Sequence, residues 1–112
     1  MMVFSIIEKE GDLITAFESN FHLTRLVKTT SATHISMVSL EPGTKIGFHK
    51  AVVPQVLLVI DGEGFVRTDT QDNQPIKKGQ AVSWDKDEGH ETITETGLAA
   101  IVIEAEELNL HY

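Results

Sequence analysis

Short apolar or alternating runs recur along this chain, and most of them end at glycine, proline, asparagine or aspartate. Helix periodicity is scarce, and runs of this length between turn residues are typical of the strands of a barrel or sandwich. The sequence therefore predicts an all-β fold. The predicted strands are Leu13–Phe17, Phe21–Lys28, Thr33–Leu40, Gln55–Ile60, Phe65–Asp69, Ala81–Trp84, His90–Glu95 and Leu98–Glu104.

The residues between these runs predict how the strands connect. Asp61-Gly62 lies between two apolar runs and predicts a tight hairpin, because both central residues of such a turn need positive φ. Pro42-Gly43 and Thr96-Gly97 predict two further turns, and residues 71–75 predict a loop.

Two of the runs are apolar at every position, 56–60 and 98–103. Strands of this kind are buried on both faces. We therefore expect both at the centre of the sheet structure.

Chain length and composition narrow the remaining possibilities. A chain of 112 residues has room for one domain, which we expect to span residues 1–112. Nine basic against seventeen acidic residues give a net charge of −8, which argues against a nucleic-acid partner. The absence of cysteine, of a signal-peptide pattern and of a long apolar stretch predicts a cytoplasmic protein with no membrane contact.

A specific spacing of residues occupies positions 43–62. Gly43 is followed after five residues by His49, then by Ala51, Gln55 and Gly62 at intervals of one, three and six residues.

A second spacing occupies positions 79–94. Gly79 is followed after five residues by Asp85, then by Asp87, His90 and Thr94 at intervals of one, two and three residues.

These two spacings resemble the signature motifs of the cupin superfamily, G-x5-H-x-H-x3-E-x6-G and G-x5-P-x-G-x2-H-x3-N. The resemblance covers roughly residues 33–104. It implies a small single-domain cupin, that is, a jelly-roll-like antiparallel double-stranded β-barrel or sandwich. It also implies that His49 and His90 point inward from adjacent strands.

The metal ligands that the resemblance would imply are incomplete. Cupins that bind Fe, Mn, Zn or Ni use three histidines and one glutamate, and this chain keeps His49 and His90. Ala51 replaces a histidine, and Gln55 replaces the glutamate with a neutral, poorer ligand. A metal site of His49, His90 and Gln55 would hold Zn, Ni, Fe or Mn only weakly.

Five residues are candidates for the ligand-binding site: His34, His49, Gln55, Trp84 and His90. His49 and His90 could form a working pocket pair or be remnants of a metal site. Gln55 could face the same cavity or lie exposed at a strand end. Trp84 could form a pocket wall, core or dimer interface. His34 could reach the interior or lie on the surface.

The acidic residues around His90 leave a further alternative open. Asp85, Asp87, Glu88 and Glu91 could form a solvated loop, or one of them could turn inward and replace the missing carboxylate.

The N-terminal arm, residues 1–11, bears on assembly. Its apolar start, Met1 to Ile7, would be an aggregation risk if it were left exposed. Cupins commonly pair N-terminal strands across a two-fold axis, so the resemblance implies a homodimer.

Three functions remain compatible with the sequence. The favoured hypothesis is a module that binds a small-molecule ligand around His49, Gln55 and His90 without a tightly bound metal. The alternatives are an enzyme and a structural scaffold. The enzyme would be a metal-dependent oxygenase or isomerase with an altered ligand set, or a metal-free epimerase-like protein.

Overall fold

The computed structural model describes residues 1–6 and 11–110, and it confirms the all-β prediction. Apart from the short 3-10 turn η1 (Ala16–Glu18), every regular element described is a strand. None of the described helical segments is long and apolar enough to cross a membrane. The strands are β1 (Met2–Ser5), β2 (Asp12–Ile14), β3 (Phe21–Leu23), β4 (Val27–Thr29), β5 (Thr33–Leu40), β6 (Lys45–Lys50), β7 (Gln55–Thr68), β8 (Gln74–Lys77), β9 (Gln80–Trp84), β10 (Gly89–Ile93), β11 (Leu98–Ala105) and β12 (Leu108–Leu110).

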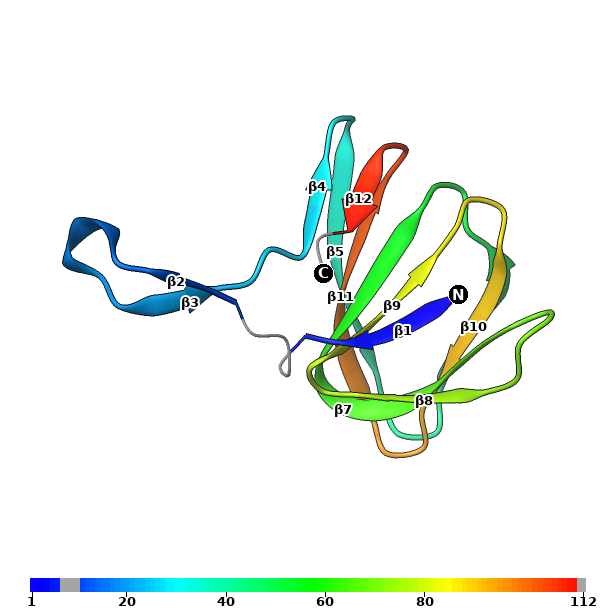
Figure 1. Ribbon diagram of the computed structural model, residues 1–112. Coiled ribbons are helices and arrows are strands. Elements are labelled where there is room, and N and C mark those ends of the chain that lie inside the picture. The colour runs from blue at the N-terminus through cyan, green and yellow to red at the C-terminus, as the bar shows by residue number, and fades with distance from the viewer. Residues whose placement is uncertain (7–10, 111–112) are drawn as a thin grey trace.

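Eight of the described strands form two layers that share one long strand, and β2–β3 and β4–β12 form two separate two-stranded sheets. The first layer has the order β1-β9-β7-β11-β5, and the second has the order β8-β7-β10-β6. All pairs are antiparallel, and β7 curves from one layer into the other (Figure 1). The central place predicted for the runs 56–60 and 98–103 is confirmed, because β7 and β11 each have a neighbour on both sides.

The predicted hairpin at Asp61-Gly62 is wrong, because β7 runs through both residues without reversing. Gly62 does have the positive φ that suggested a turn, at 78°. That conformation serves a bend next to a register shift between Ala99 and Ala100 on β11. A β-carbon at Gly62 would lie 2.1 Å from the carbonyl oxygen of Gly97, so close backbone packing requires glycine here.

Several strand boundaries also differ from the predictions. The predicted strand 13–17 ends at Ile14, and Phe17 instead adopts a positive φ of 57°. The predicted strand 21–28 is divided into β3 and β4. The predicted loop 71–75 gives its last residues to β8, where Pro75 fits because β8 pairs only with β7.

Strand β6 is not among the strand ranges predicted from local patterns, although the resemblance implied a strand carrying His49. Half of its six residues are polar, it contains Gly47, and five of the six are exposed. It lies at the edge of the second layer, where an apolar pattern is not needed. This strand carries His49.

The core lies between the two layers. Its largest fully buried side chains come from β7, β8, β9 and β10, and Trp84 and Leu98 extend it. The largest fully buried side chains are Leu57, Ile76, Val59, Val66, Val82 and Thr92.

The N-terminal arm is paired within its own chain over the part that is described. β1 pairs with β9, and Met1 and Val3 pack against the core; Ile7 and residues 8–10 lie outside the described residues.

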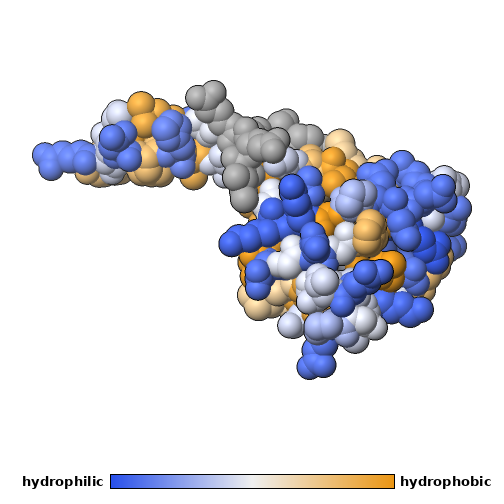
Figure 2. All heavy atoms as spheres, turned by 90° about the horizontal axis from the view of Figure 1, so that it is seen from below, coloured by the Kyte–Doolittle hydropathy of each residue, from blue (hydrophilic) through white to orange (hydrophobic). Residues whose placement is uncertain are grey.

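The hairpin that follows the arm along the chain is apolar and more exposed. The β2–β3 hairpin projects from the body (Figures 1 and 2), with Phe17 at its tip 99% exposed.

Candidate functional site

His49 and His90 lie side by side on adjacent strands. The register of β6 and β10 places them directly opposite each other, and their ring centroids are 4.5 Å apart. His90 is buried, whereas His49 is exposed. His90 therefore lies inside the sandwich, and His49 lies beside it at the solvent-exposed side.

Both imidazole rings are oriented by backbone carbonyl groups. Nδ1 of His49 lies 2.8 Å from the carbonyl oxygen of Gly47, and Nδ1 of His90 lies 3.0 Å from that of Glu88. A carbonyl oxygen only accepts, so each Nδ1 carries the proton and donates it. In the neutral ring, Nε2 is then an acceptor, and it can act as a base.

The surroundings of His90 favour its neutral form. Burial lowers the pKa of His90 below the ordinary histidine value, and the hydrogen bond to the Glu88 carbonyl opposes this shift only in part. The neighbouring His49 lowers the pKa further. Trp84 stacks on the His90 ring with centroids 4.0 Å apart and 19° between the planes.

These residues line a pocket of about 270 Å³ between the two layers. It combines the predicted residues His49, Gln55, Trp84 and His90 with an apolar wall, and we call it the histidine pocket. Its lining is Ser36, Val38, Ile46, His49, Gln55, Leu57, Trp84, His90, Thr92, Val102 and Glu104.

The pocket contains polar groups that lack a partner within the described part of the chain. The indole nitrogen of Trp84 is buried, and no group there accepts its hydrogen bond. The side chain of Gln55, a residue only 9% exposed, also forms no hydrogen bond with another described residue. Because buried polar groups are normally hydrogen-bonded, the unpaired indole nitrogen of Trp84 is an exception among the described residues.

One lining residue, Glu104, was missed in the sequence. It lies on β11, opposite Gln55 on β7, and it is partly buried. Its position has the same strand parity as the buried residues Leu98, Ala100 and Val102. A charged residue in the inward register of an apolar strand was the signal that could have identified it.

The acidic residues around His90 do not provide an inward carboxylate. Glu91 pairs with Arg67 at 3.0 Å, and Glu88 pairs with the amino group of Met1 at 2.7 Å. Asp85 and Asp87 are exposed, and none of the four lines the pocket. In this loop the solvated alternative is the one observed for the two aspartates.

His34 is not brought to the pocket. It lies on β5 opposite Glu104, but it is exposed and does not line the cavity. Ser36 and Val38, which share its strand parity, do line the cavity. His34 is one step beyond them, next to the first residue of β5.

Other motif positions have structural roles. Ala51 is fully buried, and its N–H donates to the Glu88 carbonyl at 3.0 Å. The Thr94 hydroxyl donates to the Glu63 carbonyl at 2.7 Å and accepts from the Gly97 N–H at 2.9 Å. Both positions thus connect neighbouring turns and strands.

The donor set does not fit a catalytic metal ion. Within residues 1–6 and 11–110, no group of three histidine, cysteine or acidic side chains is arranged to hold a metal. His49, His90 and the Gln55 amide carry no negative charge, and the Glu104 carboxylate in the same lining does not form a metal-holding group with the two described imidazoles.

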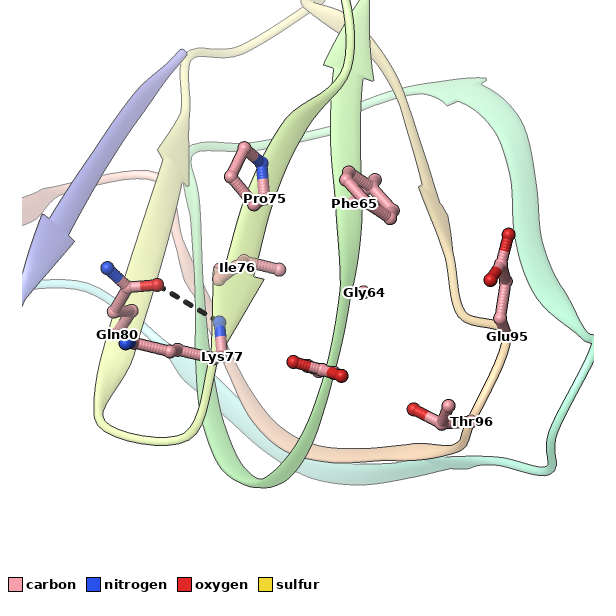
Figure 3. Close-up of a pocket in the computed structure, with 9 residues that line it drawn as sticks. Gly64, Phe65, Pro75, Ile76, Lys77, Gln80, Glu95 and Thr96 are labelled. Atoms are coloured by element: carbon pink, nitrogen blue, oxygen red, sulfur yellow. Dashed lines mark hydrogen bonds between the residues drawn. The ribbon is translucent and has the colours of Figure 1, made fainter.

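A second, larger hollow of about 430 Å³ lies away from the histidines, at the β7–β8 hairpin. Figure 3 shows Phe65 and Ile76 on this hairpin, with Glu95 and Thr96 on the opposite side. Its charged residues, Glu63, Lys77 and Glu95, are all exposed to solvent. It contains neither histidine of the motifs, so we place the candidate site in the histidine pocket.

No family model matches the chain, and no curated protein matches it. Solved structures do. A cupin superfamily protein from Desulfitobacterium hafniense is 12% identical with a TM-score of 0.61, and the match covers 75% of this chain and 81% of that one. A Klebsiella pneumoniae protein with a double-stranded β-helix domain is 17% identical with a TM-score of 0.62, over 80% and 84% of the two chains.

An enzyme is also among the similar structures. The DMSP lyase DddQ from Ruegeria pomeroyi is 16% identical with a TM-score of 0.63, and the match covers 72% of this chain but 44% of the lyase. At these identities the similarity concerns the fold and leaves the activity open. The antiparallel layers, the register that joins the two histidines and these structural matches together show that the chain has the cupin fold.

Proposed function

We propose that the protein binds a small organic molecule in the histidine pocket, without a tightly bound metal. The observation that carries this proposal is a cavity of about 270 Å³ lined by two oriented imidazoles and by Trp84, whose buried indole nitrogen has no acceptor among the described residues. A mainly apolar cavity with a few oriented polar groups is the usual form of a small-molecule site. A scaffold protein would gain nothing from leaving this donor unpaired.

The alternative of a metal-dependent oxygenase or isomerase has less support. It needs a third strong ligand, and the described residues supply none in reach of both imidazoles. A metal-free reaction would use His90 as a base, because its lowered pKa keeps Nε2 free to accept a proton.

The proposal is tested by screening small organic fragments against the metal-free protein, with ligand-observed NMR as the readout. We expect fragments that bind the parent to bind the His49→Ala variant at least about tenfold more weakly. His22→Ala is the matched control, because His22 is exposed on β3 outside the pocket. It should bind like the parent.

Two results would contradict the proposal. One is fragment binding that survives His49→Ala unchanged. The other is stoichiometric Fe, Mn, Ni or Zn in protein purified without added metal, which would favour the enzyme alternative.

A further inference from the structure

Glu104 is the acidic side chain in the lining of the histidine pocket, and that lining includes no lysine or arginine. Within the described residues it forms no ion pair, whereas Glu88 and Glu91, the partly buried carboxylates next to His90, each have one. Its neighbours across the strands are Gln55 and His34. A carboxylate in the pocket lining with no cationic side chain beside it can pair with a positive charge from outside the chain.

The rest of the cavity favours an apolar body next to that charge. Ile46, Leu57 and Val102 provide aliphatic walls, and the stacked Trp84 and His90 rings provide a flat aromatic one. The Trp84 indole N–H requires an acceptor. A net charge of −8 over the whole chain adds a field that attracts cations and repels anions.

We propose that the histidine pocket selects a small protonated amine, with its cationic nitrogen paired to Glu104 and its apolar part against Leu57 and Trp84. This inference rests on the proposed function and names the class of ligand. A hydroxyl or carbonyl oxygen on the same molecule completes the match by accepting from the Trp84 indole.

The test uses three probes of nearly equal size and different charge: benzylamine, benzyl alcohol and benzoate. Trp84 is the single tryptophan of the chain, so its fluorescence reports from the pocket alone. Titrations at about pH 8 keep the amine protonated and lie above the ordinary histidine pKa of about 6.5. We expect benzylamine to bind at least about tenfold more tightly than benzoate, with benzyl alcohol between them.

Glu104→Gln should remove this preference, because the amide keeps the shape of the side chain and loses its charge. Glu106→Gln is the matched control, since Glu106 is an exposed carboxylate two residues further along. It removes the same charge from the protein and should leave the benzylamine affinity unchanged. Circular dichroism of both variants checks that the fold is retained.

Three other results would contradict one or both proposals. Benzoate or benzyl alcohol binding as tightly as benzylamine would overturn the amine inference and leave the small-molecule site standing. The same holds if Glu104→Gln binds benzylamine as well as the parent does. A Trp84 signal that responds to none of the three probes, together with a failed fragment screen, would overturn both proposals.

Discussion

His90 is a buried polar residue of the pocket, and its ring stacks on the Trp84 side chain. It is 3% exposed and stacks on Trp84, which is also 3% exposed. Contacts of this kind contribute about 0.5–1.5 kcal/mol beyond area burial. Truncating His90 therefore costs stability as well as binding, and His49 is the better position for a test of binding alone.

The lowered pKa of His90 predicts how stability depends on pH. As the pH falls through about 6.5, the unfolded chain takes up a proton at this residue while the folded chain does not. The free energy of unfolding should therefore fall between that pH and the lowered folded-state pKa, and this contribution should level off below it. Urea unfolding of the parent and of His90→Gln across this range should show a shallower fall for the variant. Parallel curves would contradict the assignment.

Gln55 predicts the response to metal. Gln55→Glu would add a carboxylate to the two imidazoles and complete a three-ligand set. We expect calorimetry to show Zn²⁺ binding at least about tenfold tighter than in the parent, which is about 1.4 kcal/mol. Gln74→Glu, on β8 outside the pocket, is the control. A parent that already binds as tightly as Gln55→Glu would show that the missing ligand is not the cause of weak binding.

At the scale of elements, β7 joins the two layers and positions both sides of the pocket. Its first half pairs with β11 and β9, which carry Glu104 and Trp84, and its second half pairs with β10, which carries His90. The bend at Gly62 lets one strand serve both layers.

Gly62→Ala should therefore be strongly destabilising. The added methyl group meets the Gly97 carbonyl, and the residue must keep a positive φ. We expect the free energy of unfolding to fall by at least about 2 kcal/mol. Gly47→Ala on β6 is the control, because nothing lies within 4 Å of the added carbon, and its change should stay within about 0.5 kcal/mol. Equal effects in the two variants would contradict the close-packing account.

At the scale of the whole molecule, two apolar surfaces have no layer packed over them within the described part of the chain. One is the β2–β3 hairpin with Leu13 and Phe17, and the other is the outer face of β5, where Ile35 is 69% and Met37 65% exposed. An isolated two-stranded hairpin is marginally stable in water, so a second copy of the chain is the natural cover. The homodimer stays a prediction, but these surfaces now carry it better than the paired N-terminal arm does.

Light scattering should give a mass near twice the 12.4 kDa of one chain. Met37→Glu should shift the protein toward the monomer, because it places a charge on the apolar face of β5. Val52→Glu adds the same charge at an exposed apolar residue in the β6–β7 loop and should leave the mass unchanged. A parent that remains monomeric at micromolar concentration would rule out the dimer.

Local sequence patterns predicted the all-β fold and the central strands, since strand periodicity and turn residues depend on neighbouring residues. The four pocket residues His49, Gln55, Trp84 and His90 were candidates through the resemblance of the motif spacings to a known fold, and the structure places them in one lining. The tertiary structure decided the rest. Whether Asp61-Gly62 closes a hairpin or bends a continuous strand depends on the Gly97 backbone packed against it. Glu104 reaches the pocket only because β11 pairs with β7 and β5, whereas Glu88 and Glu91 are drawn away by cations from distant segments. Such choices follow from long-range strand pairing, which no local pattern contains.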